Sequence, residues 1–274
     1  IFKTVKQGSA VENELAEAPA LSKISSGQMK GEKWHSWLER KPIQFTILTT
    51  IAVAIGGIVQ IVPMIVVKSN IPTISSVKPY SPLELEGRDL YIREGCNNCH
   101  SQMIRPFRSE VKRYGEYSKS GEYVYDHPFL WGSKRTGPDL HRIGGKYNDN
   151  WHFNHMWSPQ RMDEKSVMPA YKWLFDNKAM DISDIEKKMS VMVTLGVPYT
   201  DADIANAKKS IETQSAQIEK NLHNDPDFVK SYEDSKKKAA AKGETFVPMK
   251  DREIVALIAY LQRMGTDIKV KKAE

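Results

Sequence analysis

Two cysteines and a histidine form the motif in this chain that is best suited to chemistry. The motif is Cys96-Asn97-Asn98-Cys99-His100, and it uses both cysteines of the sequence. Two thiols one helical turn apart can each add to a vinyl group of one haem, and the adjoining imidazole can then bind the iron as its proximal ligand. The spacing therefore predicts one covalently bound haem c, held by Cys96, Cys99 and His100.

Three other uses of a C-x-x-C pair fit the sequence less well. A thiol redox site with this spacing is expected near a βαβ pattern, and no such pattern is visible. A zinc site needs further ligands to close its tetrahedron, and the sequence has no second cysteine pair. A structural disulfide is rarely needed by a chain of 274 residues.

A six-coordinate iron needs a second axial ligand, and methionine would raise the reduction potential and favour electron transfer. Met168 stands out among the eleven methionines because Pro169 follows it on an apparent loop, 68 residues after His100. Small c-type cytochromes resemble this order of motif, Gly-Pro turn, Met-Pro loop and last helix. The alternatives that stay open are Met162, Met156, Met180, His152 and His155.

The turn Gly137-Pro138-Asp139-Leu140 lies between the motif and Met168. A rigid turn of this kind could place the carbonyl oxygen of Pro138 against the free ring nitrogen of His100. That hydrogen bond would fix the tautomer and raise the basicity of the ligand. Pro138 is therefore included among the residues expected to support the haem.

Residues 43–67 form an uncharged run of 25 residues. A helix of this length extends about 37 Å, which is enough to cross a hydrocarbon core of about 30 Å. The run is too long for the apolar part of a signal peptide, and it follows a polar tail or linker, residues 1–42. Residues 22–41 hold five Lys and Arg while residues 68–87 hold two, which predicts a cytoplasmic N-terminus and a periplasmic haem domain at a bacterial inner membrane.

The remaining elements are predicted to be helical. Residues 83–94 read as a helix with Ser81 as its N-cap, and residues 251–264 as an amphipathic helix that Asp251 caps and Gly265 ends. The two helices are expected to pack together and close the haem pocket. Residues 199–245 read as an inserted, solvated helical hairpin with a narrow seam of Ile204, Ile211 and Ile218.

These elements predict an all-α fold: one N-terminal transmembrane helix, then a class I cytochrome c-like haem domain, residues 80–274, with the charged insertion. The net charge of +6 comes from basic residues interleaved with acids, so no nucleic-acid partner is expected. Membrane lipid is an expected partner.

From Tyr80 to Phe175 the chain closely resembles subunit II of the cbb3-type cytochrome c oxidases, a membrane-anchored mono-haem subunit. The runs that carry the resemblance are YSPLELEGRDLYIREGCNNCHSQMIRPFRSEVKRYGEYS, GEYVYDHPFLWGSKRTGPDL, IGGKY and SVMPAY. The resemblance implies Cys96 and Cys99 as thioether sites, His100 as the proximal ligand and Met168 as the distal ligand. Lys172 stands where a proline is expected, which could loosen the ligand loop.

The resemblance also implies a function and partners. The subunit would relay single electrons from other c-type haems to a b-type haem in a haem–copper catalytic subunit, which reduces oxygen to water and pumps protons in aerobic or microaerobic respiration. It would be a redox subunit without a catalytic residue of its own. Further expected partners are a di-haem c-type subunit and soluble or membrane-bound cytochromes c as donors. The Ile1 start suggests that the catalytic subunit is fused upstream.

Arg105 and Arg108, in the SQMIRPFR loop, are candidates for pairing with haem carboxylates or with acidic groups of a partner. Three alternative functions stay open: the mono-haem subunit of a nitric oxide reductase-like complex, a membrane-tethered thiol or metal module, and an assembly subunit whose haem only supports folding.

Overall fold

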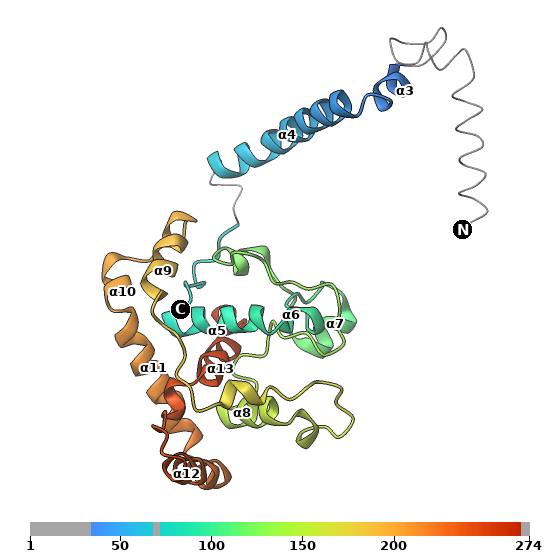
Figure 1. The fold of residues 1–274 in the computed structure, drawn as a ribbon. Helices are drawn as coiled ribbons and strands as arrows, with labels where there is room; N and C mark the ends of the chain where they lie inside the picture. The colour runs from blue at the N-terminus through green and yellow to red at the C-terminus, as the bar shows by residue number, and fades with distance from the viewer. Residues whose placement is uncertain (1–33, 68–71, 270–274) are drawn as a thin grey trace, which may run out of the picture. The chain divides into compact units, whose positions relative to one another are not determined.

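A computed structural model of the chain describes residues 34–67 and 72–269 (Figure 1). The chain divides into two compact units, residues 1–71 and 72–274. All regular secondary structure in the described residues is helical, so the predicted all-α class is confirmed. Most of the predicted N-terminal tail lies outside the described residues.

The first unit contains a short helix, α3 (Trp34–Glu39), and a long one, α4 (Pro42–Val66). Pro42 occupies the first turn of α4, where its missing N–H costs no hydrogen bond. The helix carries no charged residue, and its described apolar side chains are exposed all round. From Pro42 to Met64 it is long and apolar enough to cross a membrane, as the uncharged run predicted.

The second unit contains nine α-helices among its described residues. In chain order they are α5 (Pro82–Arg93), α6 (Cys96–Cys99), α7 (Arg108–Tyr114), α8 (Asp149–Trp157), α9 (Ile185–Thr194), α10 (Asp201–Ala205), α11 (Ala207–Leu222), α12 (Pro226–Ala241) and α13 (Glu253–Arg263). Short 3-10 turns are η2 (Ser120–Tyr123), η3 (Pro159–Arg161), η4 (Lys172–Phe175), η5 (Met249–Asp251) and η6 (Asp267–Lys269).

Helix α5 begins as the sequence predicted. The hydroxyl of Ser81 accepts a hydrogen bond from the amide of Glu84, and the carboxylate of Glu84 accepts one from the amide of Ser81 at 2.8 Å. This capping box satisfies two otherwise unpaired amides of the first turn. Leu83 and Tyr91 are buried, and they face the core of the unit.

Helices α5 and α13 form the centre of the unit and pack directly on each other. The contact is close because α5 carries Gly87. A methyl group at Gly87 would stand 1.9 Å from the carbonyl oxygen of Ala256 in α13. The ring of Tyr260, in α13, packs edge-on against Tyr91 in α5 with 5.4 Å between centroids. The predicted pairing of these two helices is confirmed.

The start of α13 differs from the prediction. Asp251 lies in the 3-10 turn η5, and Arg252 takes the N-cap position without a capping side-chain hydrogen bond. Gly265 follows the helix with φ of 64°, the left-handed conformation that favours glycine where a helix ends. The predicted Asp251 cap is therefore wrong, whereas the predicted end is confirmed.

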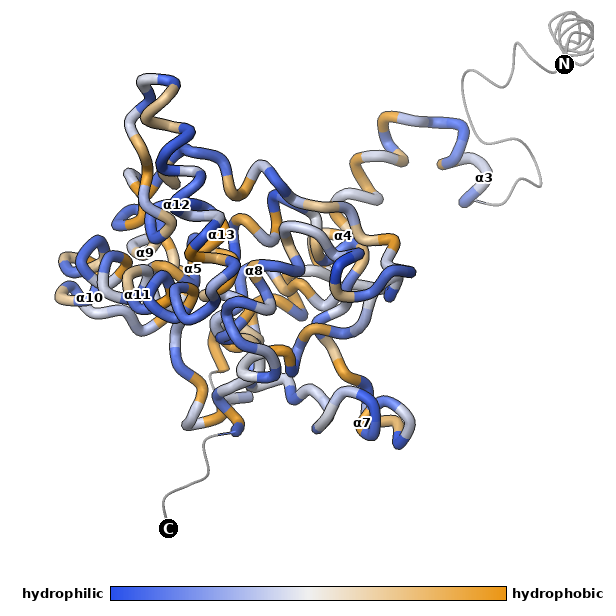
Figure 2. Tube along the Cα trace, turned by 90° about the horizontal axis from the view of Figure 1, so that it is seen from below, coloured by the Kyte–Doolittle hydropathy of each residue, from blue (hydrophilic) through white to orange (hydrophobic). Residues whose placement is uncertain are grey.

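The segment predicted as a solvated hairpin is divided into α10, α11 and α12. Ile204 belongs to α10, while Ile211 and Ile218 belong to α11 and are buried. Helix α11 packs against α5, α8 and α13, so its apolar seam joins the core of the domain. The prediction that residues 199–245 form a solvated hairpin is wrong for α11, although α10 and α11 are largely hydrophilic along their length (Figure 2).

Candidate functional site

The Cys-x-x-Cys-His motif forms a short helix directly after α5. Gly95, with φ of 69°, takes a left-handed conformation that turns the chain from α5 into α6. Cys96 and Cys99 are the first and last residues of α6, so they lie one helical turn apart. His100 follows in an extended conformation, and its amide donates to the carbonyl oxygen of Cys96 at 2.9 Å. Two thiols and an imidazole thus come from one turn of chain.

Both thiols are free, but they differ in exposure. Cys96 is half-buried and packs against the core, whereas Cys99 is exposed. Burial raises the pKa of the Cys96 thiol to about 12, and the carboxylate of Glu94 adds to the shift. Such a thiol is protonated at neutral pH and is a weak nucleophile. Redox C-x-x-C sites have the opposite property, because the pKa of their reactive thiol is lowered.

The imidazole of His100 is held by the turn at Pro138. Nδ1 of His100 lies 2.8 Å from the carbonyl oxygen of Pro138. A carbonyl can only accept, so Nδ1 carries the hydrogen, and Nε2 is the nitrogen left for an iron. Burial lowers the pKa of His100, which favours the neutral imidazole that metal binding requires.

Gly137 lies flat against the same ring. A methyl group here would stand 2.2 Å from Cε1 of His100, far inside the ordinary separation of two carbon atoms. Gly137 is not among the glycines with positive φ, so the ring, rather than the backbone conformation, requires its small size. Its amide also donates to the carbonyl oxygen of Cys99 at 3.0 Å. Sequence reasoning selected Pro138 and missed Gly137, although the Gly-Pro pair was the available signal.

A network of polar contacts joins the loop after the motif to the loop that contains the turn. The carboxylate of Asp139 accepts hydrogen bonds from the hydroxyl of Ser101 at 2.6 Å and the amide of Met103 at 2.8 Å. Arg135 donates to Ser101 at 2.6 Å and to the carboxylate of Glu110 at 2.8 Å. The Arg135 hydrogen bond is the main reason that the pKa of Glu110 is lowered to about 2. Nothing in the sequence analysis predicted this network.

The two candidate arginines of the SQMIRPFR loop have different surroundings. Arg105 forms an ion pair with the carboxylate of Glu110, and its guanidinium lies over the ring of Phe107. Arg108 begins α7 and is exposed. Arg105 is therefore engaged within the chain.

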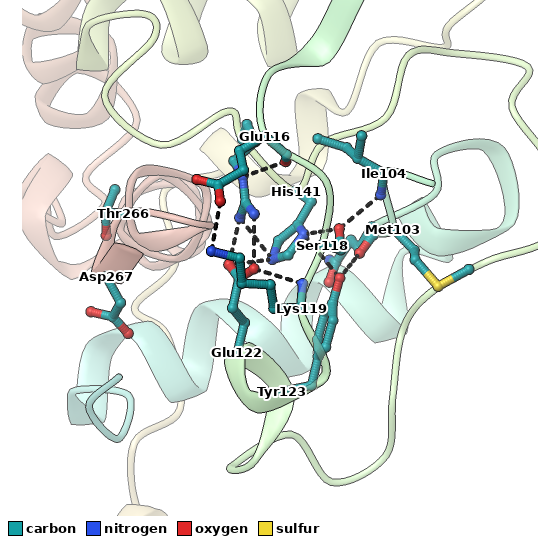
Figure 3. Close-up of polar contacts among 12 residues, drawn as sticks. Met103, Ile104, Glu116, Ser118, Lys119, Glu122, Tyr123, His141, Thr266 and Asp267 are labelled. Carbon is teal, nitrogen blue, oxygen red and sulfur yellow. Dashed lines mark hydrogen bonds and ion pairs between the residues drawn. The ribbon is translucent and has the colours of Figure 1, made fainter. Parts of the chain in front are cut away.

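A second polar network surrounds His141 (Figure 3). Nδ1 of His141 lies 2.9 Å from the hydroxyl of Tyr123 and within hydrogen-bond distance of the hydroxyl of Ser118. Arg142 donates two hydrogen bonds to the carboxylate of Glu122, at 2.5 and 2.8 Å. Burial lowers the pKa of His141 to about 3, so its ring is neutral. Bidentate and buried contacts of this kind fix the loops around the motif.

Met168 lies on the loop between η3 and η4. It is half-buried and packs against the core. The side-chain amide of Gln160 donates to the carbonyl oxygens of Met168 and Ser166, at 2.9 and 3.1 Å. Three residues on, the amide of Tyr171 donates to the carbonyl oxygen of Met156 in α8 at 3.0 Å. The loop is thus held at one end by Gln160 and at the other by α8.

The other candidate axial ligands have varied surroundings. Met156 is buried in the core, Met162 is exposed, and the amide of Met180 donates to the carbonyl oxygen of Asp251. His152 and His155 are on α8, and each has one buried ring nitrogen without a partner among the described residues.

Four of the five predicted site residues form one cluster: Cys96, Cys99, His100 and Pro138. Among the described residues, no hydrogen bond or ion pair joins Met168 to this cluster. Such a contact is not needed, because a porphyrin separates its two axial ligands. The free thiols, the neutral imidazole with an available Nε2 and the side-chain-free surface of Gly137 fit a c-type haem. No group of three His, Cys, Asp or Glu in the described ranges could hold a metal ion.

Comparison with known proteins gives one family. The chain matches the family described as cytochrome C oxidase, mono-heme subunit/FixO over residues 35–268. The match includes the apolar helix α4, the Cys-x-x-Cys-His motif, the Met168 loop and α13. No curated protein matches the chain.

Proposed function

Because the chain belongs to this family of mono-haem cytochrome c oxidase subunits, we propose that it is the single-electron relay of a cbb3-type haem–copper oxidase. The haem is attached through thioether bonds to Cys96 and Cys99. Nε2 of His100 and the sulfur of Met168 would hold its iron as the proximal and distal ligands. When bound, this haem supplies a one-electron centre that alternates between ferric and ferrous iron.

The residues around the motif position the haem and take no part in bond breaking. Pro138 keeps His100 in the tautomer that leaves Nε2 for iron, and Gly137 lets the turn approach the ring. A fixed proximal ligand holds both the potential and the position of the haem constant, which electron transfer between fixed partners requires. The hydrogen bond between His100 and Pro138 is the observation that carries this proposal.

The proposed partners follow from the family. Electrons arrive from a di-haem c-type subunit or from soluble or membrane-bound cytochromes c. They leave to a b-type haem of the haem–copper subunit, where oxygen is reduced to water and protons are pumped. Helix α4 crosses the bacterial inner membrane with the N-terminus in the cytoplasm, and residues 80–274 lie in the periplasm. The charge bias of five against two around the uncharged run supports this orientation.

Three other functions were considered for the motif. A thiol oxidoreductase needs a thiolate, and burial raises the pKa of Cys96 to about 12. An assembly subunit would need its haem only as a folding support. A subunit of a nitric oxide reductase-like complex would use the same local chemistry with another catalytic partner.

The first experiment asks whether the haem is covalent and which partners accompany it. The chain is purified in mild detergent, and its haem is stained after denaturing electrophoresis. We expect staining at the mass of this chain, and copurification of a haem–copper subunit. Absence of covalent haem would reject the proposal.

The second experiment tests the distal ligand. Met168→Ala should lower the midpoint potential of the haem in a redox titration and reduce oxidase turnover, because thioether ligation raises the potential. Met162→Ala is the matched control, since Met162 is an exposed methionine of the same loop. If Met168→Ala leaves the midpoint unchanged, Met168 is not the ligand. A changed midpoint with normal turnover would instead favour the assembly role.

A further inference from the structure

Helix α8 carries two imidazoles with unused hydrogen-bonding capacity. Nε2 of His152 and Nδ1 of His155 are buried and have no hydrogen-bond partner among the described residues. A buried polar nitrogen without a partner costs free energy, so such an atom in a native fold commonly faces a group that is bound there. The two histidines differ in what surrounds them.

The ring of His155 is fixed by a stack of aromatic side chains on one face of α8. His155 lies parallel to Trp151, with 4.7 Å between centroids and 12° between planes. Trp151 lies in turn on Tyr147, at 3.9 Å and 13°. The stack orients the imidazole before any ligand arrives, which lowers the entropic cost of using it.

His155 lies next to the residue that anchors the Met168 loop. Burial lowers the pKa of His155, which favours its neutral imidazole. The next residue, Met156, accepts the hydrogen bond from Tyr171 that holds one end of the Met168 loop. The last turn of α8, which carries His155, therefore borders the proposed haem site.

A haem carries two carboxylates, for which arginine is the usual protein donor. Most arginines around the motif are already engaged. The ion pairs are Arg88–Asp126, Arg105–Glu110, Arg135–Glu110 and Arg142–Glu122. Arg108 and Arg113 on α7 and Arg161 in η3 belong to none of these ion pairs, and all three are exposed.

We propose that Nδ1–H of His155 donates a hydrogen bond to one carboxylate of the haem. This inference rests on the proposed function, because it requires the haem to be attached at Cys96 and Cys99. His155 would then be a cofactor-binding residue and not an axial ligand. A donor to the carboxylate offsets part of its negative charge, which otherwise stabilises ferric iron. Removing the Nδ1–H donor of His155 should therefore favour the ferric state.

The test compares His155→Leu, which removes the donor, with His155→Gln, which keeps an N–H. Each full-length chain is purified with its haem in mild detergent. At a fixed ambient potential, His155→Leu should lower the ratio of reduced to oxidised haem about threefold, the effect of part of one charge-assisted hydrogen bond. His155→Gln should restore most of that ratio. His223→Gln, at an exposed histidine that follows α11, is the control, and it should leave the ratio unchanged.

Resonance Raman spectroscopy provides a second measurement. In the wild-type chain, the carboxylate bending mode of the haem should shift on exchange from H₂O to D₂O, and His155→Leu should abolish the shift. The ferric methionine–iron band should persist in both His155 variants, since His155 is not the axial ligand.

The outcomes separate this inference from the proposed function. Wild-type chain without covalent haem would reject the function itself. Covalent haem with no D₂O shift in the wild type, or an unchanged redox ratio and bending mode in His155→Leu, would overturn the role of His155 alone. An equal drop in His155→Gln and His155→Leu would also overturn it, because the N–H donor would then be irrelevant.

Discussion

Replacing Gly137 with alanine tests whether the proximal imidazole is held against the turn. The added methyl group would stand 2.2 Å from Cε1, 2.7 Å from Nδ1 and 2.9 Å from Nε2 of His100. The backbone at Gly137 is outside the positive-φ region, so alanine adds no conformational strain there. The imidazole ring is the obstacle, and in the haem-loaded chain the iron would prevent the ring from swinging away.

The cost of this substitution can be worked from the geometry. Carbon atoms pack at about 3.5 Å, so Cε1 and the methyl group must separate by about 1.3 Å. Such a displacement would break the 2.8 Å hydrogen bond between His100 and Pro138. Overpacking costs about 1–3 kcal/mol and the lost hydrogen bond about 0.5–1.5 kcal/mol, which together give about 2–4 kcal/mol. For a domain of this size, the melting temperature should fall by roughly 5–15 °C.

Calorimetry and a redox titration of the haem-loaded chain check both consequences of Gly137→Ala. The midpoint potential should also change, because the hydrogen bond to Pro138 tunes the basicity of His100. Thr136→Ala is the matched control, since Thr136 is the exposed residue next to Gly137. A Gly137→Ala chain that melts within about 1 °C of the wild type, with an unchanged midpoint, would refute the reasoning, given the expected scale of 2–4 °C per kcal/mol.

Three further predictions concern the supports of the site. Gly87→Ala gains about 1 kcal/mol of helix propensity, but its methyl group meets the backbone of α13 at 1.9 Å, so denaturant titration should show net destabilisation. The pKa of Glu110 is about 2, below its ordinary value of 4.5, so the stability that Glu110 contributes is present above pH 4.5 and is lost as the pH falls towards 2. Glu110→Gln should flatten that acid dependence of the unfolding free energy, and an unchanged curve would contradict the role of Arg135. Gln160 holds the Met168 loop, so Gln160→Ala should loosen that loop before the helices unfold. In a denaturant titration, the ferric methionine–iron band should then disappear at a lower denaturant concentration than the helical circular dichroism signal. Coincident transitions of the two signals would count against this.

The elements that sequence reasoning located best are those with strong local signals. Helix α4 is an uncharged run, and its observed bounds differ from the predicted ones by a single residue at each end. Helix α5 carries its own start signal in Ser81, Pro82 and Glu84, which act over one turn and need no tertiary context. Within α5, Gly87 allows the close approach of α13.

The elements that were missed depend on tertiary contacts. Helix α8 is nine residues long, and histidine and aromatic residues give it no clear amphipathic period. Its stability comes from packing against α11, α13 and the Met168 loop. Asp251 looked like a cap by residue type, but the chain continues through a 3-10 turn before α13 starts. A narrow seam does not reveal whether its partner is one helix or the domain core, so the burial of α11 was not predictable.

The same division applies to the site. The motif and the Gly-Pro turn are local, so sequence spacing could propose that His100 and Pro138 meet. The network of Asp139, Arg135 and Glu110 joins residues up to 38 positions apart, and nothing in their spacing predicts it. The positions of the loops in the folded chain decide which polar residues pair, so these pairs could not be predicted from the sequence.

The two sides of the proposed haem are supported very differently. On the histidine side, backbone hydrogen bonds from Gly137 to Cys99 and from Leu140 to Ser101 join the turn to the motif, at 3.0 and 2.9 Å. On the methionine side, Gln160 supplies the side-chain contact to the backbone of Met168, and the side chain of the preceding Val167 is 79% exposed. Local opening should therefore begin at the methionine loop. Because the proposed thioether sites, Cys96 and Cys99, and the proposed proximal ligand, His100, all lie on the rigid side, such opening would lower the potential of the proposed haem without releasing it.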